Sequence, residues 1–301
     1  MYFEDLIKAI EELNSSYNKL LNSQEYRIGK RMLELKKDFS LVSFFKYFRS
    51  REIEKKIQRK NPSLAIKPSN TFGKKIIGLN GAIYTCITNG YDSVKEPLFK
   101  PLELTYYCFA EKKISSESIW VYKKIPSNIL LMGNCNANRY CKMHPFSFFE
   151  NYDFSIYIDG NIRTISDMSL LYDIAKKSKT GLALHIHSRR QCVYEEIEAC
   201  LLYGKGDANA LLRYKKKLEE ESFPKNFGLF QASVIVVDLK NAYAKKILDA
   251  WWNEYNTSKT QRDQLTLPYV IWKMGFKCSD VGFLGNDAYC NPKYQVISHG
   301  M

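Results

Sequence analysis

The sequence predicts an α/β protein in which helices pack on a largely parallel β-sheet. From Lys74 onward, short apolar segments typical of strands alternate with longer amphipathic segments typical of helices, and this alternation favours a layered α/β fold. The chain has 301 residues, of which 45% are hydrophobic and 14% aromatic. A chain of this length and composition buries a sizeable core and is not intrinsically disordered.

Seven segments are predicted strands, because each is a short run rich in apolar, aromatic and β-branched residues. They are residues 81–88, 103–110, 118–125, 154–158, 181–187 and 228–239, with a last one within 294–300. Strands joined through helices pair in parallel, so their carboxyl ends meet at one edge of the sheet.

Six segments are predicted helices, because apolar residues recur in them at helical spacing. They are residues 136–149, 166–177, 192–204, 207–221, 241–255 and 262–275. Ser166 is the expected N-cap of the second one.

Residues 1–60 differ in character from the rest of the chain. Residues 27–60 contain twelve Lys or Arg against four acids, and the apolar segment FSLVSFFKYF (39–48) lies among them. One interpretation is a helix that lies in the plane of a membrane surface, where apolar burial and attraction to anionic lipid add. The alternative is a basic helical hairpin that packs on the main domain.

The predicted domain organisation has three parts. Residues 1–60 form the basic amphipathic helical segment, and residues 61–73, rich in Pro, Ser and Gly, read as a linker. Residues 74–301 form the main domain.

The net charge of +13 fits an acidic partner: nucleic acid, an anionic membrane surface or a phosphate-bearing substrate. Nucleic acid is not expected, since the basic surplus is confined to an aromatic N-terminal segment and no nucleic-acid-binding motif appears. The eight cysteines lack a CxxC pair or zinc-site spacing, which indicates reduced thiols in a reducing compartment. The chain shows no signal peptide and no run of about 18 apolar residues. We therefore expect a cytoplasmic protein, peripheral at the inner face of the cell membrane.

Polar residues that directly follow apolar strands are candidates for ligand binding, because ligands of open α/β sheets bind beyond the carboxyl ends of strands. Asp159 and Asn161 flank Gly160 after the strand 154–158, and their oxygen atoms are of the type that binds Mn²⁺ or Mg²⁺. His299 follows the last strand and is a possible third metal ligand. The alternatives are an ordinary Asp-Gly-Asn turn and a frayed tail.

Other candidate residues come from helices and strand ends. Arg139 and Lys142 lie three residues apart, hence on one helix face, where they would neutralise phosphate or remain solvated charges. His187 ends a strand, whereas His185 on the same face is more typical of a hydrogen-bonded core histidine. Glu195 and Glu196 then begin a helix, as bases or as ordinary first-turn acids.

These residues stand in a set of motifs that resembles a known family. The motifs are YTCITNGYDSVKEP, YYCFAEKK, RYCKMHPFSFFENYDFSIYIDGNI, HSRRQCVYEEIEAC, FPKNFGL, WWNEY and RDQLTLPYVIWKMG. Their order and spacing, over roughly residues 76–285, resemble a glycosyltransferase-like domain family found in plant Golgi proteins of mucilage and pollen and in bacterial polysaccharide loci. The resemblance implies a GT-A fold, a Rossmann-like nucleotide-sugar domain.

The resemblance also implies donor-binding residues. Asp159 and Asn161 match the Asp-x-Asp-type turn that binds a divalent metal and the nucleotide diphosphate, although Asn161 leaves one formal charge there. Arg139 and Lys142 match the helix that faces the donor. The residues that match the first strand's contact with base and ribose are Thr88, Asn89, Gly90, Tyr91 and Asp92.

Two further matches concern catalysis. His187, Arg190, Tyr194 and Glu195 match a His-x-x-Arg…Tyr-Glu pattern of the family, with Ser188 where the family usually has Pro. Asp263-Gln264 resembles the Asp-Gln pair of glycogenin-like retaining transferases, which implies contact with the acceptor and the anomeric carbon.

The expected function is metal-assisted transfer of a sugar, with retention, from a UDP-sugar or similar nucleoside diphosphate donor to a glycan or lipid-linked acceptor. The expected setting is surface polysaccharide synthesis, such as capsule or lipopolysaccharide. Asp263, Gln264, Glu195 and His187 are the catalytic candidates, and Arg190 is a donor-binding one. The alternative is a non-catalytic glycan- or membrane-binding module with a degenerate donor site, which Asn161 favours. The oligomeric state stays open.

Overall fold

The computed structural model describes residues 78–99, 101 and 104–297, together with Ser15. The strands and α-helices given below lie in one compact unit that comprises residues 68–289 and 293–301. The expected basic segment, the linker and His299 lie outside the described residues, and the predicted domain boundaries stay predictions.

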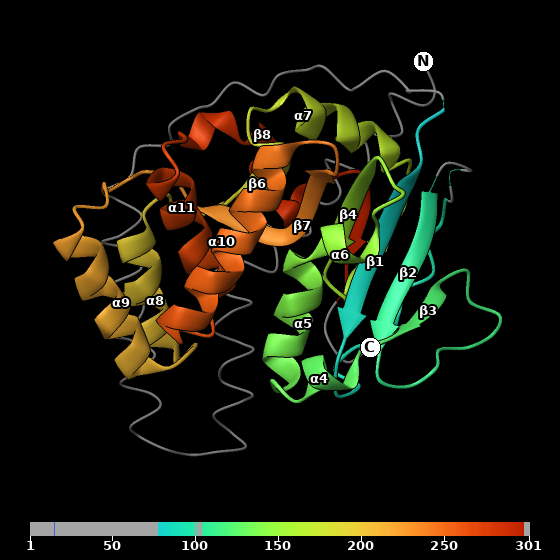
Figure 1. Ribbon diagram of the computed structural model, residues 1–301, viewed down its shortest axis with the longest axis horizontal. Coiled ribbons are helices and arrows are strands. Elements are labelled where there is room, and N and C mark those ends of the chain that lie inside the picture. The colour runs from blue at the N-terminus through green and yellow to red at the C-terminus, as the bar shows by residue number, and fades with distance from the viewer. Residues whose placement is uncertain (1–14, 16–77, 100, 102–103, 298–301) are drawn as a thin grey trace. The chain divides into compact units, whose positions relative to one another are not determined.

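A seven-stranded sheet forms the centre of the fold, with strand order β3-β2-β1-β4-β7-β6-β8 (Figure 1). Only β7 runs antiparallel to its neighbours β4 and β6; the other pairs are parallel. This confirms the predicted mixed, mainly parallel sheet. The strands are β1 (Gly81–Ile87), β2 (Leu104–Ala110), β3 (Val121–Lys124), β4 (Phe154–Ile158), β6 (Leu182–Ile186), β7 (Phe230–Asp238) and β8 (Gly282–Phe283).

The strand order reverses between β1 and β4. The chain adds β2 and β3 on one side of β1 and then crosses to place β4 on the other side. Such a reversal leaves a crevice at the carboxyl ends of the two strands, where ligands of α/β sheets bind. At the opposite, amino ends of β1 and β4, Gly81 pairs with Phe154, and a Cβ on Gly81 would lie 2.2 Å from Cζ of Phe154.

Both faces of the sheet are buried, because side chains alternate between two hydrophobic clusters. Tyr84 and Tyr157 face a cluster covered by α5, α8, α9, α10 and α11, whereas Ile83 and Ile156 face one covered by α7. Figure 1 shows α5 and α10 in front of the sheet. The helices are α5 (Asn134–Met143), α7 (Tyr172–Lys177), α8 (Val193–Tyr203), α9 (Ala208–Glu220), α10 (Ala242–Ser258) and α11 (Asp263–Lys273).

Several elements differ from their predicted bounds. The predicted helix 136–149 is broken into α5 and α6 (Pro145–Phe148), because Pro145 cannot continue the hydrogen-bonding of α5. Ser166 is not an N-cap: Oδ1 of Asp167 accepts the N–H of Ser169 instead. The short elements are α4 (Ser127–Leu130), η1 (Ser169–Leu171), η2 (Cys278–Asp280), η3 (Ala288–Cys290) and the antiparallel pair β5 (Ile162–Thr164) and β9 (Tyr294–Val296).

No helix within the described part of the chain is long and apolar enough to cross a membrane.

Candidate functional site

The turn after β1 forms one wall of the crevice between β1 and β4. Asn89 and Gly90 have φ of 55° and 61°, left-handed values that Asn and Gly tolerate better than other residues, and Tyr91 N–H closes the turn on Thr88 C=O at 3.1 Å. The N–H of Asn89 also donates to Oε1 of Glu111 at 2.6 Å. The turn is therefore fixed, and it presents the Tyr91 side chain, which is 66% exposed.

The turn after β4 forms the opposite wall. Asp159 is held through its backbone, since its N–H donates to Ser233 C=O at 2.9 Å and its C=O accepts the N–H of Ile162. Its side chain is 34% exposed. The two turns touch: a Cβ on Gly160 would lie 3.2 Å from Cβ of Asp92 and 3.3 Å from its Oδ2. Asp92 and the Asp159 turn therefore lie side by side at the carboxyl ends of β1 and β4.

Asn161 fastens this turn to the C-terminal part of the domain. Its Nδ2 donates to Ile297 C=O at 3.0 Å, and Ile297 N–H donates back to Asn161 C=O at 2.8 Å. With the amide nitrogen used in this way, Oδ1 is the side-chain atom left for a metal. Among the described residues, no three His, Cys, Asp or Glu side chains gather closely enough to hold a metal ion. His299 is not among those residues.

A buried cluster of charges joins α5 to α11 behind the Asp159 turn. Nζ of Lys142 donates to Oδ2 of Asp263 at 2.7 Å and lies 3.9 Å from Oδ1 of Asp159. Nε of Arg139 lies 3.2 Å from the same Asp263 oxygen, an ion pair outside the angular range of a hydrogen bond. The side chains of Lys142 and Asp263 are only 3% and 7% exposed. Arg139, Lys142 and Asp159, which were predicted separately, thus meet at one place together with Asp263.

Local hydrogen bonds hold this cluster in position. The Tyr84 hydroxyl donates to Lys142 C=O at 2.8 Å and so fixes the end of α5 against β1. The indole N–H of Trp251 donates to Asp263 C=O at 2.9 Å and fixes the start of α11 against α10. Both helices are therefore anchored at the residues that carry the charges.

The charges determine the ionisation of Asp263. Burial alone would raise the pKa of its carboxyl, but the nearby Arg139 and Lys142 outweigh burial and bring the pKa well below its usual range. Asp263 is therefore ionised near neutral pH, and a carboxylate of such low pKa is a weak proton acceptor.

His187 and Arg190 belong to a second cluster, at the carboxyl end of β6. Nδ1 of His187 accepts the N–H groups of Arg189 and Arg190 at 3.3 and 3.1 Å, so the proton of the neutral ring lies on Nε2. Burial lowers the pKa of His187 to about 4. Nε of Arg190 donates to Oε2 of Glu196, which also lies 3.8 Å from Nε2 of His187. The Arg190 side chain thus pairs with a carboxylate of its own chain.

The remaining predicted residues have different surroundings. Glu196, not Glu195, is the buried carboxylate beside His187, and Glu195 is half-buried. Gln264 is half-buried next to Asp263. The Tyr194 hydroxyl donates to Phe223 C=O, a packing role. His185 is a core histidine, as predicted, because it is fully buried and its Nε2 lies 2.7 Å from the Tyr294 hydroxyl.

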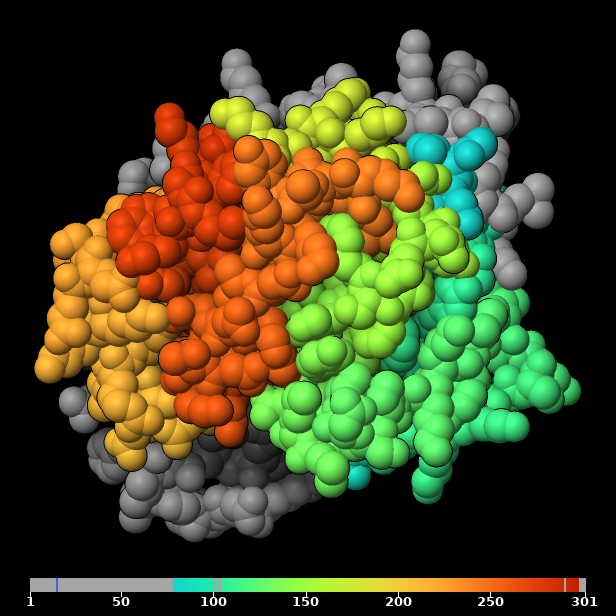
Figure 2. Space-filling view, viewed as in Figure 1, coloured from blue at the N-terminus to red at the C-terminus, as the bar shows by residue number. Residues whose placement is uncertain are grey.

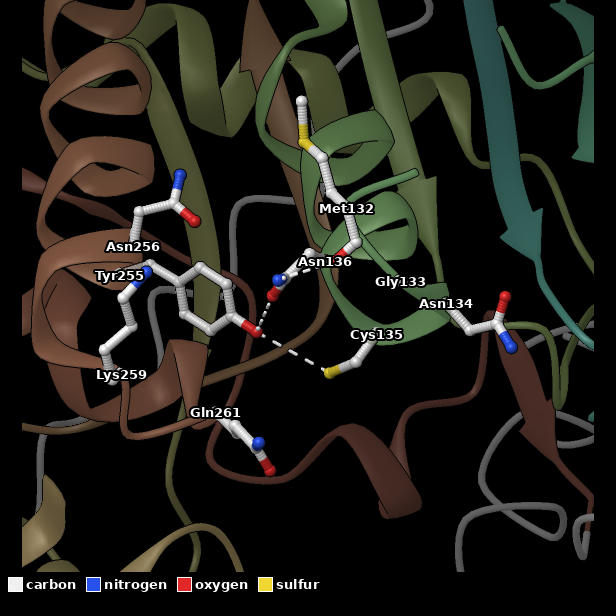
Figure 3. Close-up of a pocket in the computed structure, with 9 residues that line it drawn as sticks. All are labelled: Met132, Gly133, Asn134, Cys135, Asn136, Tyr255, Asn256, Lys259 and Gln261. Atoms are coloured by element: carbon white, nitrogen blue, oxygen red, sulfur yellow. Dashed lines mark hydrogen bonds between the residues drawn. The ribbon is translucent and has the colours of Figure 1, made fainter. Parts of the chain in front are cut away.

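A pocket of about 310 Å³ opens between the start of α5 and the turn that joins α10 to α11 (Figure 3). The Tyr255 hydroxyl donates to Oδ1 of Asn136 at 3.1 Å and lies 3.6 Å from Sγ of Cys135 (Figure 3). Lys259 and Gln261 line the other side. Sequence reasoning missed this pocket, because its walls are more than 100 residues apart in the chain.

Comparison with known proteins gives one family match. A family model described as "TOD1/MUCI70, glycosyltransferase-like domain" matches residues 109–285, more than half of the chain. No curated protein matches the sequence.

Among solved structures, the chain is similar to the WbbM bifunctional glycosyltransferase (13% identity, TM-score 0.42), with 70% of this chain covered but only 40% of WbbM. It is similar to the galactosyltransferase LgtC in complex with donor and acceptor sugar analogues (11%, TM-score 0.41; 67% of this chain, 72% of LgtC). It is also similar to mouse xyloside xylosyltransferase 1 (10%, TM-score 0.42; 69% and 85%).

Proposed function

Because the chain belongs to the TOD1/MUCI70 glycosyltransferase-like domain family and has a GT-A type fold, we propose that it transfers a sugar from a nucleoside diphosphate donor, a UDP-sugar, to a glycan or lipid-linked acceptor. One observation carries the proposal. The buried Lys142 and the half-buried Arg139 lie beside Asp159 at the crevice where the strand order reverses. That is where a diphosphate binds in open α/β sheets.

Lys142 and Arg139 would stabilise the leaving group. When the bond between the anomeric carbon and the diphosphate breaks, negative charge develops on the departing oxygen, and preorganised cations lower the energy of that state. Asp263 keeps both cations in place and ionised. We therefore assign Asp263 to positioning them rather than to proton transfer, since it is buried and already paired.

The turn after β1 would bind the nucleoside. The exposed Tyr91 ring offers a stacking surface for the base, and Asp92 offers a carboxylate to the ribose hydroxyls. Thr88, Asn89 and Gly90 set the shape of this turn, since their backbone groups close it.

A divalent metal, Mn²⁺ or Mg²⁺, would bind beside Asp159. The Asp159 carboxylate and Oδ1 of Asn161 would hold it, with the Asp92 carboxylate beside the same turn, and all are of the oxygen type that these ions prefer. His299, which lies outside the described residues, is proposed as a further ligand from its position after the last strand. When bound, such a metal offsets the charge of the diphosphate.

We propose the residues that contact the acceptor from their positions next to the charge cluster and at the carboxyl end of β6. Gln264 adjoins Asp263 at the start of α11 and would face the transferred sugar, in a reaction that retains configuration. His187 and Glu195 remain candidate contacts of the acceptor, and Arg190 a candidate donor contact. Neutral His187 has its Nδ1 occupied by backbone N–H groups, so it would act through its Nε2–H.

A nucleotide-release assay over a panel of UDP-, GDP- and CDP-sugars, run with Mn²⁺ and with chelator, tests this function. We expect one donor to be turned over and the turnover to fall on chelation. If no donor in the panel is consumed, the proposed transferase activity is wrong.

A second candidate function is a non-catalytic glycan- or membrane-binding module with a degenerate donor site. Asn161 favours it, because its amide nitrogen is committed to Ile297 and its oxygen carries no formal charge. Calorimetric titration with UDP separates the two functions. A transferase should bind UDP more tightly with Mn²⁺, whereas a degenerate site should show no dependence on the metal.

We also propose that residues 27–60 bind an anionic membrane surface, which would place the protein at the cytoplasmic face of the membrane during surface polysaccharide synthesis. The support is the basic surplus around the apolar segment 39–48. Binding to anionic vesicles but not to DNA, lost when residues 1–60 are deleted, is the expected result. Equal affinity for DNA would contradict it.

A further inference from the structure

The pocket in Figure 3 offers polar groups that the donor site does not use. Its volume of about 310 Å³ lies at the lower end of the range for small-ligand pockets. Within the described part of the chain, the side chains of Asn256, Lys259 and Gln261 make no hydrogen bond or ion pair. A carboxamide can both donate and accept hydrogen bonds, as can the hydroxyls of a sugar. The lining therefore suits a saccharide better than an apolar ligand.

The backbone of one pocket wall is held in an unfavourable conformation. Lys259 and Gln261 have φ of 55° and 59°, in the left-handed region that costs an L-residue about 1–2 kcal/mol. Such conformations gather at functional sites when the surrounding structure enforces them. Here Thr260 enforces them, because it is fully buried and its Oγ1 accepts the N–H of Arg262 at 3.3 Å.

Packing against the loop before α9 maintains the conformation of this turn. A Cβ on Gly206 would lie 2.4 Å from Thr260 C=O, so only glycine lets the loop before α9 pack so closely on the turn. The backbone of the turn is thus fixed from both sides, and it places Lys259 and Gln261 at the wall of the pocket.

The pocket adjoins the charge cluster along two elements. Gln261 precedes Asp263 by two residues on the same turn, and Cys135 lies one helical turn before Arg139 on α5. A group bound in the pocket is therefore next to the place proposed for the donor diphosphate.

We propose that this pocket binds the terminal sugar of the acceptor, with Asn256, Lys259 and Gln261 bonded to its hydroxyls. The inference rests on the proposed transferase function. In the transfer, the acceptor hydroxyl oxygen bonds to the anomeric carbon, the bond from that carbon to the diphosphate oxygen breaks, and the hydroxyl proton is taken up by the leaving diphosphate.

Cys135 allows the pocket to be blocked chemically. Its thiol is exposed in the pocket wall, whereas Cys86, Cys108, Cys141, Cys192 and Cys200 are buried and Cys278 is half-buried. Addition of the thiol to the double bond of N-ethylmaleimide would place a bulky group in the pocket. The same treatment of a Cys135→Ser variant reports any effect of modification at the other cysteines.

The test measures binding of methyl glycosides of glucose, galactose, N-acetylglucosamine and galacturonic acid to the full chain by saturation-transfer NMR. We expect at least one to bind and alkylation to weaken its binding by about tenfold or more, as for loss of most of a small ligand's contacts. In Cys135→Ser, treatment should leave binding unchanged relative to the untreated variant. An Asn256→Leu variant, checked for native thermal unfolding, should weaken the same glycoside without alkylation.

The saccharide pocket is refuted if no glycoside in the panel binds, or if the alkylated protein binds as the untreated one does. UDP titrated calorimetrically into the same samples reports the donor site and should be unaffected by alkylation. Glycoside binding without UDP binding would remove the transferase function and leave the saccharide site standing. UDP binding without glycoside binding would do the reverse.

Discussion

Lys142 joins the two carboxylates of the site, since its ammonium group lies 2.7 Å from Asp263 and 3.9 Å from Asp159. The group is almost fully buried, and its Nζ lies 5.0 Å from the centre of the Tyr157 ring. A cation held this firmly does not reorient when charge develops on a leaving diphosphate, which is the condition for electrostatic catalysis.

The variant Lys142→Met should therefore lower donor turnover by about a hundredfold or more, because it removes a preorganised charge. Lys217 provides a matched control: its Nζ lies 2.7 Å from Glu254 and 4.6 Å from the centre of the Tyr269 ring. Lys217→Met should leave turnover within about twofold. Lys217 is half-buried but is likewise paired with a carboxylate and an aromatic ring. Equal losses in the two variants, measured by nucleotide release, would mean that the loss of a paired lysine acts only through stability.

His187 should be neutral over the physiological pH range. Burial lowers its pKa to about 4, and only the neutral ring can accept the N–H groups of Arg189 and Arg190. The folded pKa lies below the unfolded value of about 6.5, so His187 contributes its full stability above that value and loses it as the pH falls toward 4. NMR titration of the four histidines, assigned with His187→Gln, should give one resonance with a pKa near 4 that the variant lacks. A His187 resonance that titrates near 6.5 would contradict this environment.

Gln261 should show opposed effects on stability and binding. Gln261→Gly removes the energetic penalty of the left-handed conformation. This gain exceeds the extra backbone entropy that glycine loses on folding, so the free energy of unfolding should rise by about 0.5–1 kcal/mol. The same change removes the amide from the pocket and should weaken glycoside binding. Thermal unfolding and saturation-transfer NMR check the two effects, and a variant that is both less stable and normal in binding would contradict the role given to Gln261.

At the scale of elements, the ion pairs of Asp263 connect α5 with α11 across 121 residues of sequence. A buried carboxylate paired with two cations stabilises the fold only while it is charged. The pKa of Asp263 is lowered in the fold, so its contribution is present above the unfolded value of about 3.9 and is lost as the pH falls through the folded value.

Asp263→Asn should lower the free energy of unfolding near pH 7 by about 3 kcal/mol, because Lys142 and Arg139 lose their buried counter-charge. The difference from the wild type should shrink below about pH 4, where the unfolded wild type takes up a proton at this position. Urea unfolding at a series of pH values measures both. A difference that stays constant with pH would show that the charge of Asp263 contributes nothing.

The sequence predicted most elements but not all of their relations. Apolar segments such as Phe230–Asp238 are recognisable as strands. A strand buried on both faces has the same apolar pattern in either direction, so the sequence did not predict that β7 runs antiparallel to β4. Strand β8 has two residues, too few for a periodicity. Ser166 was wrong as a cap because the segment begins with a short 3₁₀-helix that no side chain caps, and Oδ1 of Asp167 accepts the N–H of Ser169.

The site was predictable where it depends on strand ends or helix spacing. Asp159 and Asp92 follow neighbouring parallel strands, and Arg139 and Lys142 share one helix face. The pairing of Lys142 with Asp263, and of Tyr255 with Asn136 in the pocket, is tertiary: the helices that carry these residues meet only in the folded chain. Glu195 and Glu196 illustrate the limit, since adjacent acids look alike in sequence and only one is buried.

At the scale of the whole domain, the groups proposed to bind nucleotide, diphosphate and acceptor lie at different places along one edge of the sheet. Figure 2 shows α5 and α10, which carry walls of the pocket, side by side on the viewed face. The turns after β1 and β4 would take the nucleotide, the cluster of Lys142, Arg139 and Asp263 the diphosphate, and the pocket beside Tyr255 the acceptor. In this proposal, donor and acceptor would bind next to each other at the carboxyl edge, as a transferase requires.

Donor turnover by an Asp159→Ala variant tests the central claim most directly. Asp159 stands at the crevice, and Asp153, just before the amino end of the same strand, provides the control variant Asp153→Ala. Nucleotide release by Asp159→Ala should fall by about a hundredfold or more, while Asp153→Ala should retain turnover close to that of the wild type. Wild-type turnover in Asp159→Ala would show that Asp159 takes no part in binding or transferring the donor.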